Sequence, residues 1–251
     1  MGDAVVVGPV RAVEVIAADT ACLHVDRPFR AQPGQFAFLW IPGAQEKPYS
    51  VSGATHRRLA FTIRGVGPHS RALLALRPGD LVGLRGPFGR PFTVSPGALL
   101  VGGGIGAAPL RFLGQRLAAG GLPFRACLGA RTADGLVHRA DFEAWGARIA
   151  TDDGSAGTPG PVTDLLEALL DEDPSARIQA CGPEPMLKAV RRIAAAREVP
   201  CELSFERMMK CGLGICGQCA VEGPGFRLCV EGPVLEGPEA DLALEPGDGT
   251  R

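Results

Sequence analysis

Four cysteines close to the C-terminus constrain this chain more than any other sequence feature. They are Cys211, Cys216, Cys219 and Cys229, with the spacing C-x4-C-x2-C-x9-C. The first three match the run of cysteines that holds a plant-type [2Fe–2S] cluster. A chain that binds such a cluster must wrap closely around it, so the spacing predicts a tight loop in this region.

Two other uses of these cysteines stay open. A structural zinc site usually has two C-x2-C pairs, and here only Cys216 and Cys219 form one. Disulfides are typical of secreted proteins, and the N-terminus lacks the basic and apolar regions of a signal peptide. Glycines at 212, 214 and 217 favour the cluster, because a loop around anionic sulfur must approach it with backbone N–H groups. Three isolated cysteines, Cys22, Cys127 and Cys201, are predicted to be small core residues.

The composition is that of a globular protein without a nucleic-acid or membrane signature. Of 251 residues, 46% are hydrophobic and 21% are charged, and the net charge is −1 without a Lys/Arg run. The most apolar stretch, residues 98–110, is too short to cross a bilayer and contains four glycines. We therefore expect a cytoplasmic protein that binds neither nucleic acid nor a membrane.

Residues 1–97 are predicted to form an antiparallel β-barrel or sandwich. Hydrophobic residues alternate in the stretches 34–41 and 58–63, which is the period of strands, and Pro/Gly turns separate such short segments. In the first stretch, one face carries Phe36, Phe38 and Trp40, and the other carries Ala37, Leu39 and Ile41.

From residue 98 onward, strand and helix patterns alternate. Strands are predicted at 98–101, 124–130, 147–151 and 177–181. Helices are predicted between and after them, among them 163–170, with Thr163 as the expected N-cap, and 184–197. This alternation predicts an α/β domain with a parallel sheet covered on both faces. The chain is thus expected to be multidomain, with modules at 1–97, 98–199 and 200–251.

A glycine-rich loop joins the strand at 98–101 to the next helix. Gly102, Gly103, Gly104 and Gly106 allow the backbone to approach a pyrophosphate at the helix N-terminus. Pro109 stands where a strict Rossmann fingerprint has its third glycine, and the first helical turn accepts a proline. A tight turn without a ligand is the alternative interpretation.

A second junction of the same kind begins with Cys181, Gly182 and Pro183, after the strand predicted at 177–181. In a doubly wound sheet, both junctions lie at the carboxyl edge, where ligands bind. We therefore predict a dinucleotide site between them. Cys181 is expected either beside a nicotinamide ring or as a buried structural cysteine.

The single tyrosine lies in the sequence Lys47-Pro48-Tyr49-Ser50. Pro48 favours an extended backbone at Lys47, so that neighbouring side chains point in alternate directions. Such a stretch offers a cation for phosphate, a ring for stacking and a hydroxyl for a flavin nitrogen. A tyrosine in a core or an interface is the alternative.

Together these motifs resemble the ferredoxin–NADP reductase superfamily and, within it, the electron-transfer subunits of NAD-dependent (class 1B) dihydroorotate dehydrogenases. The resemblance covers nearly the whole chain and includes the order of the modules. It implies an FAD-binding β-barrel at 1–97, an NAD-binding α/β domain at 98–199 and a [2Fe–2S] cluster domain at 200–251. The choice of NAD over NADP is likewise what the resemblance implies.

The resemblance also assigns residues. The family's flavin motif Arg-Pro-Tyr-Ser matches 47–50, with Lys47 in place of arginine, and its motif V-G-x-G-T-x-x-L matches 66–73, where His69 replaces a glycine. The implied FAD residues are Lys47, Pro48, Tyr49, Ser50, Thr62, Ile63, Arg64, Gly67, His69 and Ser70. The implied NAD residues are Gly102, Gly103, Gly104, Gly106, Pro109, Cys181, Gly182 and Pro183. The implied cluster ligands are Cys211, Cys216, Cys219 and Cys229.

The family's activity follows as an expectation. The resemblance implies a partner subunit that carries FMN and oxidises dihydroorotate to orotate in pyrimidine biosynthesis. Electrons would pass from FMN through the [2Fe–2S] cluster and FAD to NAD⁺, because a flavin exchanges both hydride and single electrons. No catalytic residue for dihydroorotate is expected on this chain, and two copies of each subunit are expected to form a heterotetramer.

Other functions remain open on the sequence alone. One is a diaphorase-type subunit of a sulfhydrogenase or of a ferredoxin:NADP transhydrogenase, which differs in its electron partner. Another is a zinc-stabilised scaffold, which would be colourless, and a third is an iron–sulfur redox sensor, which would not oxidise NADH.

Overall fold

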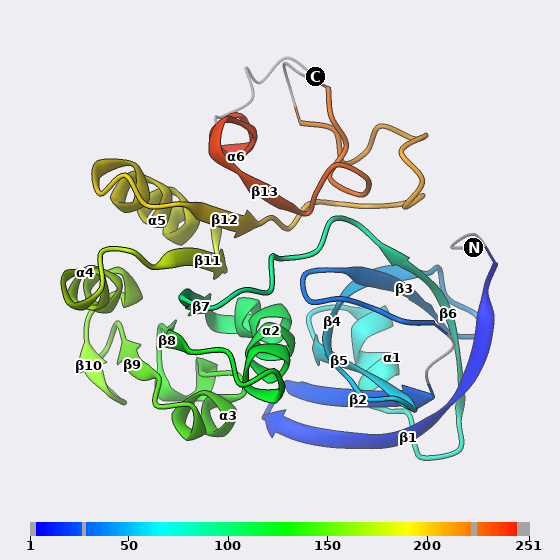
Figure 1. Cartoon of the computed structure of the whole chain (residues 1–251). Helices are drawn as coiled ribbons and strands as arrows, with labels where there is room; N and C mark the ends of the chain where they lie inside the picture. Colours follow the sequence, from blue (N-terminus) through cyan, green and yellow to red (C-terminus); the bar gives the residue numbers. More distant parts are fainter. Residues whose placement is uncertain (1–3, 27–28, 222–224, 245–251) are drawn as a thin grey trace.

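The computed structural model describes residues 4–26, 29–221 and 225–244. Figure 1 shows a barrel, a sheet with helices on both faces, and a C-terminal segment that lies above both. This is the multidomain architecture that the sequence predicts. The division at residues 97 and 199 stays a prediction, since the C-terminal segment also contributes strands to the sheet.

Within the described residues, six antiparallel strands close into the barrel. Its inward-facing side chains, such as Leu39, Phe61 and Leu84, are fully buried. A short helix, α1 (Pro68–Leu74), follows β5. In their order around the barrel, the strands are β1 (Val6–Ala17), β2 (Thr20–Asp26), β5 (Arg58–Arg64), β4 (Lys47–Ala54), β3 (Phe36–Trp40) and β6 (Leu81–Phe88).

Strand β3 is buried on both of its faces. Ala37 and Leu39 belong to the core inside the barrel. Phe36 and Phe38 point outward, but they pack in the core that includes the C-terminal segment. The predicted alternation is therefore present, and both sides are apolar because the second face is covered by another part of the chain.

The sheet contains seven strands, all within the described residues. Its parallel strands run in the order β10, β9, β8, β7, β11 and β12, and β13 adds an antiparallel edge. The predicted strands are confirmed to within two residues. Their bounds are β7 (Ala98–Gly103), β8 (Phe124–Ala130), β9 (Arg148–Thr151), β10 (Thr158–Pro159), β11 (Arg177–Cys181), β12 (Cys201–Ser204) and β13 (Val234–Glu236).

Helices cover both faces of this sheet. Leu100 of β7 packs with α2 and α3 on one face, whereas Leu99 and Val101 pack with α4, α5 and α6 on the other. The expected N-cap at Thr163 is wrong, because extended Pro161 precedes the helix and Thr163 lies inside its first turn. The helices are η1 (Gly104–Gly106), α2 (Ala107–Ala119), η2 (Ala133–Gly135), α3 (Arg139–Ala144), α4 (Val162–Glu172), α5 (Glu184–Ala196) and α6 (Gly237–Leu244).

Buried polar contacts join the barrel to the sheet domain. A hydrogen bond of 2.6 Å links Thr62 Oγ1 on β5 to His138 Nε2 beside α3. Arg111 of α2 donates to Asp141 Oδ2 at 2.6 Å and to the Ser52 carbonyl oxygen on β4 at 3.2 Å. Because buried polar groups need partners, these bonds fix how the two units sit against each other.

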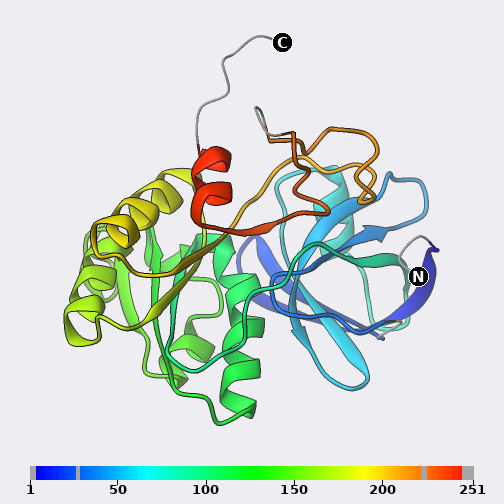
Figure 2. The ribbon, with the colours of Figure 1, turned by 45° about the horizontal axis from the view of Figure 1, so that its top comes forward.

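The C-terminal segment leaves the sheet after β12 and returns to it at β13. Between them, the described residues 205–221 and 225–233 lie over the end of the barrel, as the orange trace in Figure 2 shows. We call the part from Cys211 to Cys229 the cluster loop. Among the residues described, no helix combines the length and the hydrophobicity that a membrane span requires.

Candidate functional site

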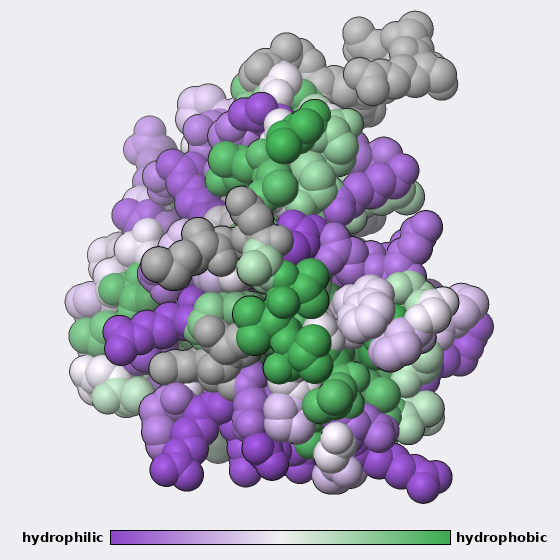
Figure 3. All heavy atoms as spheres, turned by 90° about the vertical axis from the view of Figure 1, so that its right-hand side faces the viewer, coloured by the Kyte–Doolittle hydropathy of each residue, from purple (hydrophilic) through white to green (hydrophobic). Residues whose placement is uncertain are grey.

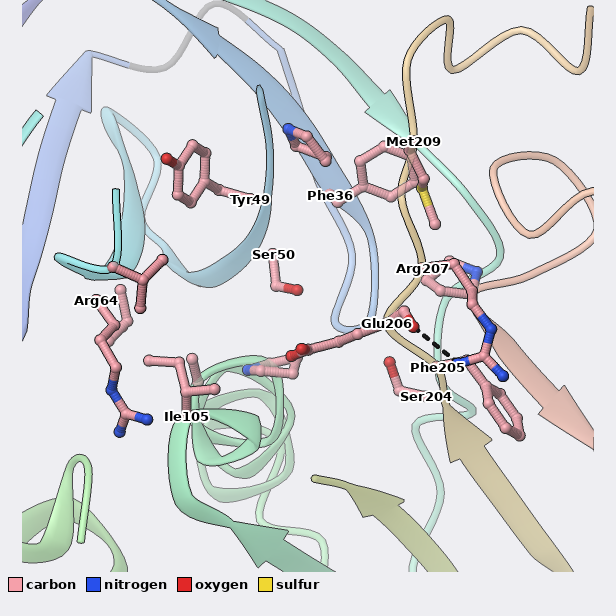
Figure 4. A pocket seen from close by; sticks show the side chains of 16 residues that line it. Phe36, Tyr49, Ser50, Arg64, Ile105, Ser204, Phe205, Glu206, Arg207 and Met209 are labelled. Carbon is pink, nitrogen blue, oxygen red and sulfur yellow. Dashed lines mark hydrogen bonds between the residues drawn. The ribbon is translucent and has the colours of Figure 1, made fainter. Parts of the chain in front are cut away.

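A cleft of about 360 Å³ lies where the barrel, the sheet and the C-terminal segment meet (Figure 4). Strands β4 and β5 form one wall, η1 and the start of α2 form the second, and residues 204–209 form the third. The cleft has the size of a small-molecule site. Six of the predicted binding residues line it, namely Pro48, Tyr49, Ser50, Thr62, Arg64 and Pro109.

Other predicted flavin residues do not line the cleft. The side chain of Lys47 is exposed on β4, and Ile63 is fully buried in the barrel core. Gly67 stands at the N-cap of α1, where its N–H donates to Ser70 Oγ at 3.0 Å, and the Ser70 hydroxyl donates back to the Gly67 carbonyl at 3.1 Å. In this structure, Ser70 therefore serves the helix start.

Tyr49 and His69 join the two predicted flavin motifs. The Tyr49 hydroxyl and His69 Nδ1 are 3.0 Å apart, and the two rings stack with their centroids 5.9 Å apart. Burial raises the pKa of Tyr49 to about 12. Burial and the charge of Lys47 lower the pKa of His69, although the Leu39 carbonyl acts in the opposite direction. At neutral pH the pair is thus an uncharged phenol and an uncharged imidazole.

Two buried nitrogen atoms of the predicted flavin residues have no hydrogen-bond partner among the described residues. They are His69 Nε2 and Arg64 Nε. Arg64 Nε forms an ion pair with Asp19 Oδ2 at 3.9 Å, which is too long for a hydrogen bond. Because buried polar atoms are normally paired, both atoms have capacity for a polar ligand.

The two predicted nucleotide junctions are brought together at the carboxyl ends of β7 and β11. Gly102 pairs with Cys181 in the sheet. A Cβ placed on Gly106 would lie 2.3 Å from the Cys181 carbonyl oxygen, and one on Gly182 would lie 3.0 Å from the Gly103 Cα. Glycine is required here because the two backbones touch. Gly104 has a φ of +53°, and Pro183 is the N-cap of α5.

Cys181 itself is enclosed rather than part of the cleft lining. It is 2% exposed. Burial and the charge of Glu206 raise the pKa of its thiol well above the usual value, which a hydrogen bond with Ser204 only partly offsets. The residue is therefore a neutral thiol, and a position beside a nicotinamide ring stays a prediction.

The third wall of the cleft was not identified from the sequence. It includes Glu206, Arg207 and Met209, and the ring of Phe36 lies beside Met209 (Figure 4). Glu206 is accessible to solvent, yet desolvation inside the cleft raises the pKa of its carboxyl group, and Arg64 acts against this rise. The cleft thus holds a carboxyl group that can exchange a proton nearer to neutral pH. One feature of the sequence could have indicated this wall, because residues 204–209 connect the sheet directly to the first of the four clustered cysteines.

The cluster loop has the backbone that a wrapped ligand loop needs. Gly212, Gly214 and Gly217 have φ values of +74°, +73° and +70°, a region that favours glycine. Cys219 and Cys229 are buried, Cys211 is half-buried and Cys216 is exposed.

Each sulfur atom of the four cysteines is affected mainly by one other, and Cys229 is affected in addition by the charge of Cys211. The thiol of Cys216 interacts with the sulfur of Cys211, and Cys219 interacts with Cys229. Among the described side chains, no three His, Cys, Asp or Glu residues are grouped so that they could hold a single metal ion. Coupling of the thiols in twos is compatible with a two-iron cluster, in which each iron takes two protein ligands.

The first predicted ligand, Cys211, sits in a polar backbone environment. Burial acts to raise the pKa of Cys211, but N–H groups of Cys216, Leu213 and Ile215 outweigh it and lower the pKa to about 6. The N–H of Leu213 lies 3.4 Å from the sulfur. The fourth predicted ligand behaves differently, since burial and the neighbouring Cys219 raise the pKa of Cys229 to about 12. A bound metal would favour the thiolate form of both.

Comparisons with known proteins agree with this geometry. Residues 206–241 match the family model "Iron-sulfur cluster binding domain of dihydroorotate dehydrogenase B". Two curated relatives carry the name "Probable dihydroorotate dehydrogenase B (NAD(+)), electron transfer subunit". The one from Methanopyrus kandleri is 43% identical, with 86% of each chain covered, and the one from Methanocaldococcus jannaschii is 40% identical, with 89% of this chain and 86% of the relative covered.

A solved structure shows the same architecture over nearly the whole length. It comes from work on an NADH-dependent reduced ferredoxin-NADP oxidoreductase and is 29% identical, with a TM-score of 0.82. The match covers 94% of this chain and 90% of that one. Given the identity and coverage of the curated relatives, the chain belongs to the family of dihydroorotate dehydrogenase B (NAD(+)) electron transfer subunits.

Proposed function

We propose that this chain transfers electrons from an FMN-containing dihydroorotate dehydrogenase subunit, through a [2Fe–2S] cluster and FAD, to NAD⁺ during orotate formation. One observation carries the proposal beyond the family name. The stretch 204–209 lines the cleft, and Cys211 begins the cluster loop two residues later. A flavin in the cleft and a cluster in the loop would therefore be immediate neighbours.

The cluster loop fits an iron–sulfur group in donor chemistry and in space. Cys211, Cys216, Cys219 and Cys229 would hold the two irons as the pairs described above. N–H groups such as that of Leu213 would donate to sulfur. A Cβ at Gly214 would lie 2.9 Å from Val230, so the loop closes only with glycine there.

The cleft fits a flavin with the pyrophosphate toward α1. Tyr49 and Ser50 would flank the ring system, and Arg64 and His69 would offer their unpaired nitrogens to phosphate oxygens. The adjoining glycine junctions would bind the NAD pyrophosphate at the starts of α2 and α5. When bound, FAD exchanges hydride with NAD and single electrons with the cluster. The chain's own contribution is to hold these groups close together and to exclude water from the cleft.

The partner subunit would dock on the face that carries the cluster loop. Figure 3 looks onto this side, where hydrophobic side chains gather at the top, in the centre and toward the lower right. Exposed apolar residues of the segments on this face include Val6 and Val7 of β1, and Leu213, Ile215 and Val230 around the cluster loop. Exposed apolar patches of this kind are typical of protein interfaces. Two copies of each subunit are proposed on the family resemblance alone.

The decisive experiment is an anaerobic visible spectrum of the purified chain before and after NADH is added. We expect flavin and iron–sulfur bands, both of which bleach with NADH. Addition of the FMN subunit and dihydroorotate, with NAD⁺ in place of NADH, should then produce NADH. A colourless chain that contains zinc and ignores NADH would refute the redox function altogether.

A second candidate differs only in the electron partner. The solved structure with a TM-score of 0.82 was described for an NADH-dependent reduced ferredoxin-NADP oxidoreductase, which matches the diaphorase alternative raised by the sequence. In that case, the chain would exchange electrons with a ferredoxin-linked subunit and would give no turnover with dihydroorotate and its FMN subunit.

A further inference from the structure

Arg85 is a buried arginine that contacts the cluster loop, and it belongs to none of the motifs described above. It lies on β6 and is 7% exposed. A buried arginine needs partners for its charge and for its N–H groups. All of the partners described here come from the end of the barrel and from the first turn of the cluster loop.

The guanidinium group of Arg85 bridges two parts of the chain. It forms a two-pronged ion pair with Glu46, in which Nε donates to Oε2 at 3.1 Å and Nη2 donates to Oε1. Its remaining arm, Nη1, donates to the carbonyl oxygen of Cys211 at 2.8 Å. One planar fork therefore holds a barrel carboxylate and the backbone of the first cluster ligand at the same time.

Aromatic rings complete this contact. The guanidinium carbon of Arg85 lies 4.5 Å from the ring centroid of Phe38 and 5.0 Å from that of Phe88. The same two rings support the residue after the ligand, since a Cβ on Gly212 would lie 2.8 Å from Phe38 and 3.3 Å from Phe88. The start of the cluster loop thus rests on a fixed surface of the barrel.

This surface is continuous with the cleft. The ring of Phe36, which lines the cleft, lies 5.8 Å from the ring of Phe38 and 5.7 Å from that of Phe88. The cleft wall and the support of the cluster loop are therefore parts of one packed unit. A displacement of the loop would change its distance from the cleft.

We propose that Arg85, anchored by Glu46, is a positioning residue for the iron–sulfur cluster. By fixing the Cys211 carbonyl against the barrel, it sets the direction of the Cys211 sulfur and the separation between cluster and cleft. This inference rests on the proposed function in so far as it assumes the cluster. The role needs the planar fork of arginine, because a lysine keeps the charge but cannot bond to Glu46 and Cys211 with fixed geometry.

The test compares Arg85→Lys and Arg85→Met with the wild-type chain, all purified anaerobically with their cofactors. Arg11→Lys is the matched control, since Arg11 makes a similar two-pronged pair with Asp26 on the same barrel, exposed to solvent. The measurements are iron and sulfide content, the rate of cluster loss to an iron chelator, the visible circular dichroism and the reduction potential of the cluster, and flavin content.

We expect both Arg85 variants to lose the cluster to the chelator about tenfold faster than wild type, as is typical when the support of a metal ligand is removed. The circular dichroism bands of both Arg85 variants should shift, while their flavin content should stay at the wild-type level. The control Arg11→Lys should match wild type in all of these measurements. Loss of the cation should make the potential more negative in Arg85→Met and not in Arg85→Lys. If Arg85→Met does not fold, Arg85→Lys decides the question.

A wild-type rate of cluster loss together with wild-type circular dichroism in Arg85→Lys would overturn this inference and leave the proposed function intact. A wild-type chain that binds no iron would instead overturn the proposed function, and the role of Arg85 with it.

Discussion

At the scale of single residues, the surroundings of each cysteine determine its chemistry. Cys127 is fully buried in the sheet, and burial raises the pKa of its thiol to about 12. Cys211 has a pKa of about 6, because backbone N–H groups of its own loop outweigh the effect of burial. The same side chain is thus an inert core residue at one position and a metal-ready thiolate at the other.

The change Cys211→Ser should remove the iron–sulfur absorption, because serine does not supply the thiolate that the cluster requires. Iron and sulfide content of the anaerobically purified chain check this expectation, with flavin content expected to persist. Cys127→Ala is the control and should lower the melting temperature while leaving iron content unchanged. Full iron content in Cys211→Ser would show that this residue is not a ligand.

The sequence identified six of the sixteen residues that line the cleft, although not their arrangement. Tyr49 and His69 come from two separate motifs, and nothing in either motif shows that the hydroxyl of one meets the ring nitrogen of the other. Glu206 belongs to no motif at all, and it enters the cleft only because β12 ends beside it. Contacts between distant segments depend on the fold, so a local pattern cannot reveal them.

At the scale of elements, the cluster loop shows why two of its glycines are not equivalent. Gly212 and Gly217 have nearly the same positive φ, so a side chain would strain the backbone equally at either position. Only at Gly212 would a Cβ meet a neighbour, the ring of Phe38 at 2.8 Å, whereas Gly217 has open space around it. A comparison of the two therefore isolates the contact from the strain.

We expect Gly212→Ala to lower cluster content more than Gly217→Ala, since only the first displaces the loop from the barrel. Backbone strain of about 1–2 kcal/mol should be common to both variants. Iron per chain and chemical unfolding of both proteins provide the measurement. Equal cluster content in the two variants would mean that the Phe38 contact does not support the loop.

The individual strands of the sheet were predictable because their hydrophobic runs are short and clearly bounded, as in 124–130 and 177–181. The pairing of β13 was not, since Val234–Glu236 is only three residues long and joins the sheet from beyond the cluster loop. For β3, the sequence showed two apolar faces, and the structure adds the reason, a second core outside the barrel.

The contact between β5 and the residue before α3 has a pH-dependent consequence. His138 has a φ of +58°, which histidine tolerates better than most residues, and its side chain is 2% exposed. Burial lowers its pKa to about 4, supported by Arg111 and His24 and opposed by Asp141. The folded protein therefore holds His138 neutral, whereas the unfolded chain takes up a proton below about pH 6.5.

Because the unfolded state binds the proton first, stability must fall as the pH decreases from 6.5 toward 4. From pH 7 to pH 5, this single group should cost about 2 kcal/mol of unfolding free energy. The change His138→Asn keeps a residue that tolerates this backbone and should remove that part of the pH dependence. Urea unfolding at both pH values measures it, and parallel losses in the two proteins would contradict the assignment.

At the scale of the whole molecule, the order of modules was predictable and their mutual contacts were not. The alternation of strands and helices after residue 98 gives the sheet, whereas the placement of the C-terminal segment over the barrel depends on the aromatic surface of Phe36, Phe38 and Phe88. That surface requires strands β3 and β6, which are far apart in the sequence, to pair in the barrel. The cleft is a product of all three units, and no single stretch of sequence contains it.

The partner face provides a prediction at this scale. Ile215 is 80% exposed on the cluster loop, and Val15 is 79% exposed on β1. We expect Ile215→Asp to weaken binding of the proposed FMN subunit at least tenfold, because a charge would be buried in the interface. The control Val15→Asp should leave the affinity for that subunit unchanged. Calorimetric titration of the two subunits measures the effect, and equal affinity in both variants would place the interface elsewhere.

The stretch from Ser204 to Cys211 forms a wall of the cleft and continues into the cluster loop without an intervening linker. This continuity limits where recombination between homologous genes can join parts of two such proteins. A recombination event inside the stretch would separate a wall from its strand or a ligand from its support. Crossovers between related genes should therefore be tolerated ahead of β12, where strand, wall and loop are exchanged together, and not inside this stretch.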